Sequence, residues 1–196
     1  MKRTYNWGII GLGKIAHQFA LDILKTENAK LWAVASRSKQ KAINFADEFK
    51  IPNAYGNYEE MLDCKDLDVV YIATPHSLHC ENSILFLDHG IPVLCEKPFA
   101  INSKQVDQMI LASRGRGVFL MEAMWTRFLP MINNMLKLIM DGVIGDVVNV
   151  KADFGFKANF NPTSRLFDPK LGGGALLDIG IYPCLLYTSP SPRDRG

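Results

Sequence analysis

The most constraining feature of this sequence is its N-terminal segment, residues 5–16, which reads YNWGIIGLGKIA. An apolar run that breaks into glycines and resumes with a helical pattern predicts a strand, a tight turn and a helix. Gly11 is expected to make the turn, Gly13 to let a pyrophosphate approach the backbone, and Ala16 to let the helix pack on the strand. The N-terminus of that helix would hold the phosphates. The segment therefore predicts dinucleotide binding, and a plain glycine turn is the alternative.

Length and composition limit the classes of protein to which the chain can belong. It has 196 residues, 48% of them hydrophobic, and a net charge of +2 without clusters. These values are typical of a soluble protein with one full domain and part of another, and they favour neither nucleic acid nor membrane as a partner. No stretch approaches the ~20 apolar residues of a membrane span. The four cysteines lack metal-type spacing, so we expect no metal site and reduced thiols in the cytoplasm.

The end of the second predicted strand, residues 29–35, bears on the choice of dinucleotide. NAD sites place an acidic residue there to bind the ribose hydroxyls, whereas this chain has Ser36 and Arg37. A carboxylate would repel a 2′-phosphate, while a guanidinium pairs with it and a serine hydroxyl donates to it. The sequence therefore predicts NADP in preference to NAD. The alternative is an exposed arginine at the end of a strand.

Further segments predict an α/β fold with a doubly wound parallel sheet. A nearly continuous apolar run at residues 68–73 is typical of a central parallel strand, and it ends in Thr74 and Pro75, at the edge where such sheets bind ligands. The next strand, residues 92–95, delivers Glu96 and Lys97 to the same edge; on local evidence alone, a solvated ion pair would explain these two. The remaining strands are predicted near residue 54 and at residues 118–121, and the helices at residues 39–49 with Ser38 as N-cap, 57–62, 80–88 and 105–113.

The chain is expected to divide into a nucleotide-binding domain, residues 1–122, and the start of an α+β substrate domain, residues 123–183. A helix at residues 130–140 and a strand at residues 146–156 would open that second domain. After Pro183 the sequence abandons the helical pattern. Residues 184–196 resemble the translation of a sequencing adapter, so we expect an artefactual tail, with a disordered tail as the alternative.

Four motifs in order resemble one known family, the NAD(P)-dependent sugar and polyol oxidoreductases typified by glucose–fructose oxidoreductase and inositol dehydrogenase. They are GLGKIA at residues 11–16, Ala73-Thr74-Pro75 with His79, EKP at residues 96–98, and GGGALLDIGIYP at residues 172–183. Within the family, MEAMWTRF at residues 121–128 and the pair of Asp178 and Tyr182 most resemble the subgroup of dihydrodiol and D-xylose dehydrogenases. The resemblance implies a Rossmann domain followed by an open antiparallel sheet that forms a homodimer.

The resemblance also implies the roles of individual residues. Lys97 corresponds to the family's catalytic lysine, with a peptide to Pro98 that is typically cis. Tyr182 becomes the proton donor or acceptor, and Asp178, four residues earlier, would share its helix face and reach the same substrate hydroxyl. Read without the family, Asp178 is equally well a helix-capping acid and Tyr182 a packing aromatic. The residues implied to bind the cofactor are Gly11, Leu12, Gly13, Lys14, Ile15, Ser36, Arg37, Ala73, Thr74, Pro75, His79, Glu96, Lys97, Trp125 and Arg127; for Trp125 a hinge-packing anchor is the alternative, and for His79 a structural role.

The resemblance predicts an enzyme that oxidises a cyclic polyol or an aldose, of the D-xylose or trans-1,2-dihydrodiol type, by hydride transfer to NADP. The alternatives are a non-catalytic NADP-binding regulator and a reductase of another substrate class in the same family. A sensor need not keep Lys97, Asp178 and Tyr182 together, which argues against the regulator. Because the second domain is barely begun, we expect its apolar face to be uncovered and the 196-residue chain to turn over poorly.

Overall fold

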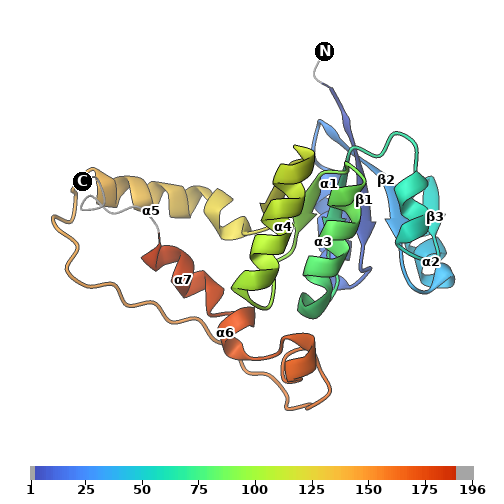
Figure 1. Cartoon of the computed structure of the whole chain (residues 1–196). Helices are drawn as coiled ribbons and strands as arrows, with labels where there is room; N and C mark the ends of the chain where they lie inside the picture. Colours follow the sequence, from blue (N-terminus) through green and yellow to red (C-terminus); the bar gives the residue numbers. More distant parts are fainter. Residues whose placement is uncertain (1–2, 189–196) are drawn as a thin grey trace. The chain divides into compact units, whose positions relative to one another are not determined.

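In the computed structural model, which describes residues 3–188, six parallel strands pair in the order β3-β2-β1-β4-β5-β6. The chain divides into two compact units, residues 1–123 and 124–196, and the sheet belongs to the first. Four α-helices and two short 3-10 helices connect the strands (Figure 1). The elements of this unit are β1 (Tyr5–Ile10), α1 (Lys14–Ile23), β2 (Ala29–Ala35), α2 (Lys39–Phe49), β3 (Asn53–Tyr55), η1 (Glu59–Asp63), β4 (Val69–Ile72), η2 (His76–Leu78), α3 (His79–Asp88), β5 (Val93–Cys95), α4 (Ser103–Arg116) and β6 (Leu120–Glu122).

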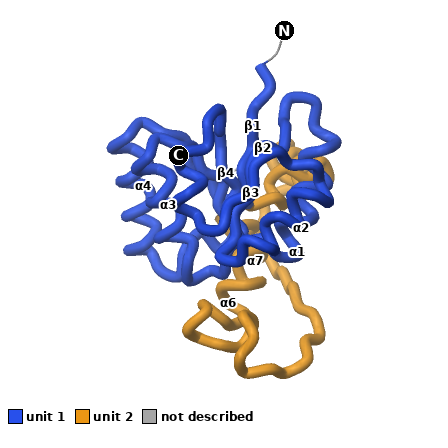
Figure 2. The backbone as a smooth tube through the Cα atoms, turned by 90° about the vertical axis from the view of Figure 1, so that its right-hand side faces the viewer, with its two compact units in different colours: residues 1–123 blue, residues 124–196 orange. Residues whose placement is uncertain are grey.

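The sheet is covered by helices on both faces. Figure 2 shows α3 and α4 on one side of the strands and α1 and α2 on the other. Successive strand residues point to opposite faces, so Ile10 and Ile72 enter the core under α3 and α4, whereas Ile9 and Tyr71 enter the core under α1 and α2. Because both faces are buried, the central strand β4 is apolar along its whole length. The predicted doubly wound α/β fold is confirmed.

Local sequence signals account for most element boundaries. The Ser38 hydroxyl accepts a hydrogen bond from the Lys41 N–H at 3.4 Å, which confirms the predicted cap of α2. Helix α4 is longer than predicted at both ends. Its first turn is capped by the Asn102 side chain, which accepts from the Gln105 N–H at 2.9 Å, and Gly117 ends it in the left-handed region at φ 64°.

The second unit consists of short helices joined by long irregular segments. Its elements are η3 (Trp125–Phe128), α5 (Pro130–Met140), η4 (Pro169–Leu171), α6 (Ala175–Asp178) and α7 (Ile181–Tyr187). The predicted helix at residues 130–140 is confirmed, but the strand predicted at residues 146–156 is wrong, since this stretch has no regular structure. A strand needs a neighbouring strand for its backbone hydrogen bonds, and no segment between residues 124 and 188 forms a strand that could pair with it.

Helix α7 corrects a second expectation about this unit. The helical pattern does not stop at Pro183: α7 begins at Ile181, takes Pro183 into its first turn and continues to Tyr187. Proline is tolerated there because the first turn of a helix lacks intrahelical partners for its N–H groups. Residues 189–196 of the predicted tail lie outside the described residues.

Candidate functional site

The residues predicted to bind the cofactor in the first unit follow the carboxyl ends of neighbouring parallel strands. Their backbones extend the ladders: the Ala73 N–H donates to the Ile10 carbonyl and the Glu96 N–H to the Ile72 carbonyl, both at 2.9 Å. The strand order changes direction between β1 and β4, because β1 pairs with β2 on its other side. Such a switch point at the carboxyl edge is where open α/β sheets bind ligands.

The turn after β1 requires glycine at Gly11. Its φ of +79° lies in the left-handed region, and a Cβ there would lie 2.5 Å from both the Ala73 carbonyl carbon and the Thr74 nitrogen. Gly13 is the N-cap of α1, and a Cβ added there would meet only the Gly11 oxygen, at 3.9 Å. The backbone in front of α1 is therefore open to a ligand. Ala16 is fully buried against the sheet, so each small residue lies as predicted.

The residues between and after these glycines differ in exposure. Leu12 is buried in the core, so only its backbone faces the turn, whereas Lys14 and Ile15 are exposed in the first turn of α1. The N–H groups of a first turn have no intrahelical carbonyl to bind, and they lie at the positive end of the helix dipole. This cradle fits a dinucleotide pyrophosphate.

At the end of β2, Ser36 is buried and Arg37 is exposed. The Ser36 N–H donates to the Tyr55 carbonyl at 3.2 Å, and its Oγ accepts from the Ser38 N–H at 3.3 Å, which fixes the start of the loop. Burial raises the pKa of the Tyr58 phenol, and the positive charge of Arg37 partly offsets this shift. Arg37 therefore provides a cation next to the loop, and no acidic residue stands between Ser36 and Lys39.

Glu96 and Tyr71 fix the backbone at Lys97. The Glu96 carboxylate accepts from the Lys97 N–H at 3.1 Å through Oε2, and its Oε1 accepts a short hydrogen bond from the Tyr71 hydroxyl. Burial, followed by the charge of Glu96, raises the pKa of Tyr71, which keeps this phenol a donor. The Lys97–Pro98 peptide bond is cis, as the resemblance implies.

His79 is fully buried, and both of its ring nitrogens lie against backbone carbonyls. Nδ1 lies 2.8 Å from the Pro98 oxygen and Nε2 lies 2.9 Å from the Thr74 oxygen. Burial lowers its pKa, so the ring is neutral and donates to one of these carbonyls at a time. His79 thus joins the loops that follow β4 and β5, and its contact with the cofactor stays a prediction.

Thr74 and Pro75 begin the loop between β4 and η2. Thr74 is buried, and its hydroxyl accepts from the Asn82 amide at 3.0 Å, while Pro75 precedes the first residue of η2. Ala73 is half-buried at the end of β4. Together with Gly11, these residues line the carboxyl edge of the sheet where β1 and β4 end.

In the second unit, Tyr182 lies among aromatic side chains. The Trp125 indole Nε1 donates to the Tyr182 hydroxyl at 3.1 Å, with the two rings 5.9 Å apart at 66°. Phe154 meets the same tyrosine edge-on at 5.1 Å. The contact of Phe154 was not predicted; its only signal is the pattern of spaced apolar residues in segment 146–156. Arg127, in η3, is exposed.

Asp178 and Tyr182 do not share one helix, which corrects the predicted common face. Asp178 ends α6 and Tyr182 lies in the first turn of α7. The helix breaks at Ile179, whose φ of −123° is not helical, and Gly180, the N-cap of α7, has helical angles again. Gly180 must be small, because a Cβ there would lie 2.6 Å from the Leu176 carbonyl oxygen. The (i, i+4) spacing is present in the sequence, but the break at Ile179 lies between the two residues.

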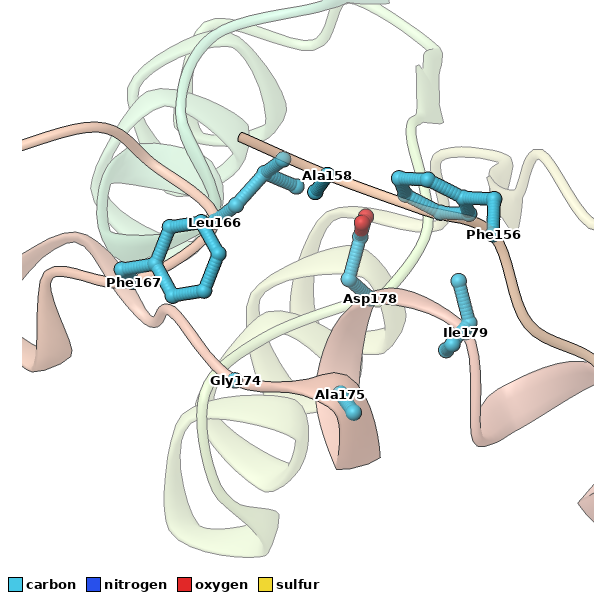
Figure 3. A pocket seen from close by; sticks show the side chains of 8 residues that line it. All are labelled: Phe156, Ala158, Leu166, Phe167, Gly174, Ala175, Asp178 and Ile179. Carbon is cyan, nitrogen blue, oxygen red and sulfur yellow. The ribbon is translucent and has the colours of Figure 1, made fainter. Parts of the chain in front are cut away.

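Asp178 is instead one wall of an apolar pocket of about 310 Å³. Figure 3 shows its carboxylate directed toward the segment that carries Phe156 and Ala158. Only 6% of Asp178 is exposed, and its Oδ1 accepts from Arg165 Nη1 at 3.0 Å, an ion pair that the sequence did not reveal. The other residues that line the pocket are Phe156, Ala158, Leu166, Phe167, Gly174, Ala175 and Ile179.

Metal-binding clusters and membrane-spanning helices are both absent from residues 3–188. The His, Cys, Asp and Glu side chains of this range nowhere gather in a group of three or more that could hold a metal ion. Each of its helices is too short or too polar to traverse a lipid bilayer.

Comparisons with known proteins agree with this geometry. Residues 5–124 match the model of the oxidoreductase family with an NAD-binding Rossmann fold, and residues 132–188 match the GFO/IDH/MocA C-terminal domain. The trans-1,2-dihydrobenzene-1,2-diol dehydrogenase of Danio rerio is 47% identical over 92% of this chain and 54% of its own length. The human enzyme of that name is 40% identical over 93% and 54%. The chain thus spans about half the length of the curated relatives it matches.

Solved structures show the same fold. The aldose-aldose oxidoreductase from Caulobacter crescentus superimposes with a TM-score of 0.86 at 32% identity, covering 93% of this chain and 56% of that one. A 3-ketoreductase from Actinomadura kijaniata, solved with TDP-benzene and NADP, superimposes with a TM-score of 0.79 at 27% identity, over 92% and 55%.

Proposed function

Because the chain belongs to the Gfo/Idh/MocA oxidoreductase family, we propose that it is an NADP-dependent dehydrogenase acting on CH–OH groups of a cyclic diol or an aldose. The observation that carries this proposal is the turn at Gly11 in front of α1, at the switch point between β1 and β4. There the open backbone at Gly13 and the helix N-terminus form a site suited to a pyrophosphate.

The preference for NADP over NAD is assigned to Arg37. Its guanidinium is exposed at the end of β2, where a family member that uses NAD would place a carboxylate. Two hydrogen bonds fix the neighbouring Ser36, and in this proposal Arg37 pairs with a 2′-phosphate through charge-assisted hydrogen bonds.

Arg37→Ala is expected to weaken NADPH binding by roughly 10- to 100-fold, since a hydrogen bond to a charged group contributes about 1.5–3 kcal/mol. NADH affinity is expected to stay within about twofold, because NADH lacks the phosphate. Both affinities are measured by titration of the reduced nicotinamide's fluorescence. Arg116→Ala, an exposed arginine in the last turn of α4, removes the same charge and serves as control. Equal losses for NADPH and NADH would contradict the assignment.

A bound nicotinamide would supply a hydride acceptor or donor for the substrate carbon, and the turn at Gly11 with the N-terminus of α1 would hold the pyrophosphate of its dinucleotide. In this proposal Tyr182 exchanges the proton of the substrate hydroxyl, and the positive charge of Lys97 supports that transfer. The hydrogen bond from Trp125 Nε1 to the Tyr182 hydroxyl stabilises the negative charge that this oxygen carries once its proton has left. Asp178, held by Arg165, orients the substrate.

The substrate class is proposed from the relatives named trans-1,2-dihydrobenzene-1,2-diol dehydrogenase and from the apolar pocket beside Asp178. The test is a single-turnover assay, in which chain and NADP at equal concentration are mixed with D-xylose or a trans-1,2-dihydrodiol and formation of reduced nicotinamide is followed. We expect reduction with one of these substrates and a loss of roughly 10²-fold or more in Tyr182→Phe. Binding of NADP without any reduction would favour a non-catalytic regulator.

Steady-state turnover by the 196-residue chain is expected to stay below that of a full-length relative. The second unit exposes large apolar side chains, including Phe128, Met131 and Val148. Exposed apolar patches of this kind promote association instead of a defined substrate site. The single-turnover assay is therefore run at low chain concentration, where association is least.

A further inference from the structure

The backbone N–H groups of Lys97 and Phe99 donate to two carboxylates, one directly after β5 and one at the end of β6. Glu96, at the end of β5, accepts from the Lys97 N–H at 3.1 Å. Glu122, the last residue of β6, accepts from the Phe99 N–H at 2.8 Å through Oε1. Pro98 has no N–H, so Lys97 and Phe99 carry the only backbone donors of residues 97–99, and each donates to a carboxylate.

The place of Glu122 follows from the register of the sheet. Strands β5 and β6 are parallel with Cys95 opposite Glu122, and the Ala123 N–H donates to the Cys95 carbonyl at 2.7 Å. Glu122 therefore lies beside the point where β5 ends and the Lys97 loop begins. Its carboxylate is half-buried, a position that is unfavourable for a charge without hydrogen-bond donors.

Pairing of β6 does not depend on this side chain. The backbone ladder already holds the strand, through the pairs Val93 with Leu120 and Leu94 with Met121 and through the Ala123 N–H. The Glu122 side chain adds a hydrogen bond to the neighbouring loop. Because this hydrogen bond joins residue 122 to residue 99, it acts on the Lys97 loop rather than on strand β6.

We propose that Glu122 is a positioning residue for Lys97, which it serves by holding the Phe99 N–H and so fixing the backbone from which the lysine side chain starts. This inference rests on the proposed function, in which the positive charge of Lys97 supports proton transfer between Tyr182 and the substrate. Fixing the backbone limits the positions that the Lys97 ammonium can take, and a displacement of about 1 Å at a reacting group can cost 10²-fold in rate.

The test compares Glu122→Ala with Glu122→Gln, whose amide oxygen still accepts from the Phe99 N–H. For the alanine variant we expect NADPH affinity within about twofold of the parent chain, faster hydrogen exchange of the Phe99 amide by about fivefold or more, and a single-turnover rate lower by about tenfold or more. For the glutamine variant we expect all three within about threefold. Glu81→Ala, an exposed acid on α3, controls for the change in charge.

Two results would overturn the inference. One is an unchanged single-turnover rate in Glu122→Ala, and the other is a glutamine variant as impaired as the alanine variant, which would assign the effect to charge instead of to the bond. Failure of the proposed function gives a different result, because the parent chain itself would then bind no NADPH or transfer no hydride. The exchange rate of the Phe99 amide shows, in either case, whether the loop has been released.

Discussion

Gly11→Ala will destabilise the first unit by about 2–5 kcal/mol and weaken NADPH binding by at least about tenfold. The left-handed φ of +79° costs an L-residue about 1–2 kcal/mol. The remainder comes from the new Cβ, which would lie 2.5 Å from the backbone of Ala73 and Thr74, where no flexible side chain can move away. The turn must open, and both Gly13 and the N-terminus of α1 shift with it. Denaturant unfolding and NADPH titration measure the two effects.

Two variants separate the causes of the Gly11→Ala effect. Gly90→Ala places a side chain at φ +75° with nothing within 4 Å, so it should cost only the strain, about 1–2 kcal/mol. Gly13→Ala has room for its Cβ, so it should fold normally and lose only affinity for the dinucleotide. A Gly11→Ala chain that unfolds at the same denaturant concentration as Gly90→Ala would contradict the close approach of β1 and β4.

Lys97→Met will lower the single-turnover rate of hydride transfer by roughly 10²- to 10³-fold, while NADPH affinity changes by less than about threefold. Methionine keeps the length of the side chain and removes its charge, so the variant tests the cation alone. The backbone hydrogen bond from residue 97 to Glu96 is retained, because it does not involve the side chain that is replaced. Stopped-flow detection of reduced nicotinamide measures the rate.

The matched control is Lys104→Met, which removes an exposed lysine from the first turn of α4 and should leave the rate unchanged. A Lys97→Met chain that reduces NADP at the parent rate would refute the catalytic assignment of Lys97. Parallel loss of NADPH binding and hydride transfer would instead indicate that Lys97 binds the cofactor without taking part in proton transfer.

The sheet of the first unit was predictable because its signals are local. Strand β2 was predicted with the observed bounds, and Ser38 was correctly identified as the cap of α2. In a doubly wound fold, each strand ends at the same edge, so the placement of Gly11, Thr74 and Glu96 follows from topology alone. Helix α4 was predicted too short because the cap at Asn102 was overlooked.

The second unit was harder to predict because its structure depends on contacts between distant residues. The alternation at residues 146–156 is a strand pattern, yet a strand forms only beside a partner, and residues 124–188 provide none. The break between α6 and α7 lies at Ile179, whose non-helical backbone the (i, i+4) spacing does not reveal. In the same way, the ion pair of Arg165 with Asp178 joins residues that no local motif connects.

The candidate site residues show the same contrast between local signals and contacts of distant residues. Those that lie at strand ends, such as Gly11 and Lys97, were predicted from the sequence and its family resemblance. The residues that hold them, above all Glu122 with its bond to the Phe99 N–H, became visible only from the register of β5 and β6. The two hydrogen-bond neighbours of His79 were not visible from the sequence for the same reason, since they come from different loops.

An NMR titration of the isotope-labelled chain with NADPH, followed through its backbone amides, decides whether this edge of the sheet binds a dinucleotide. We expect a saturable shift of amides at residues 11–15 and 73–74, the turn and the neighbouring loop, together with those of Ser36 and Arg37. NADH should shift the first group and leave the amides of Ser36 and Arg37 nearly unchanged. Absence of saturable shifts at residues 11–15 with either dinucleotide would contradict the proposal that this edge of the sheet is a dinucleotide site.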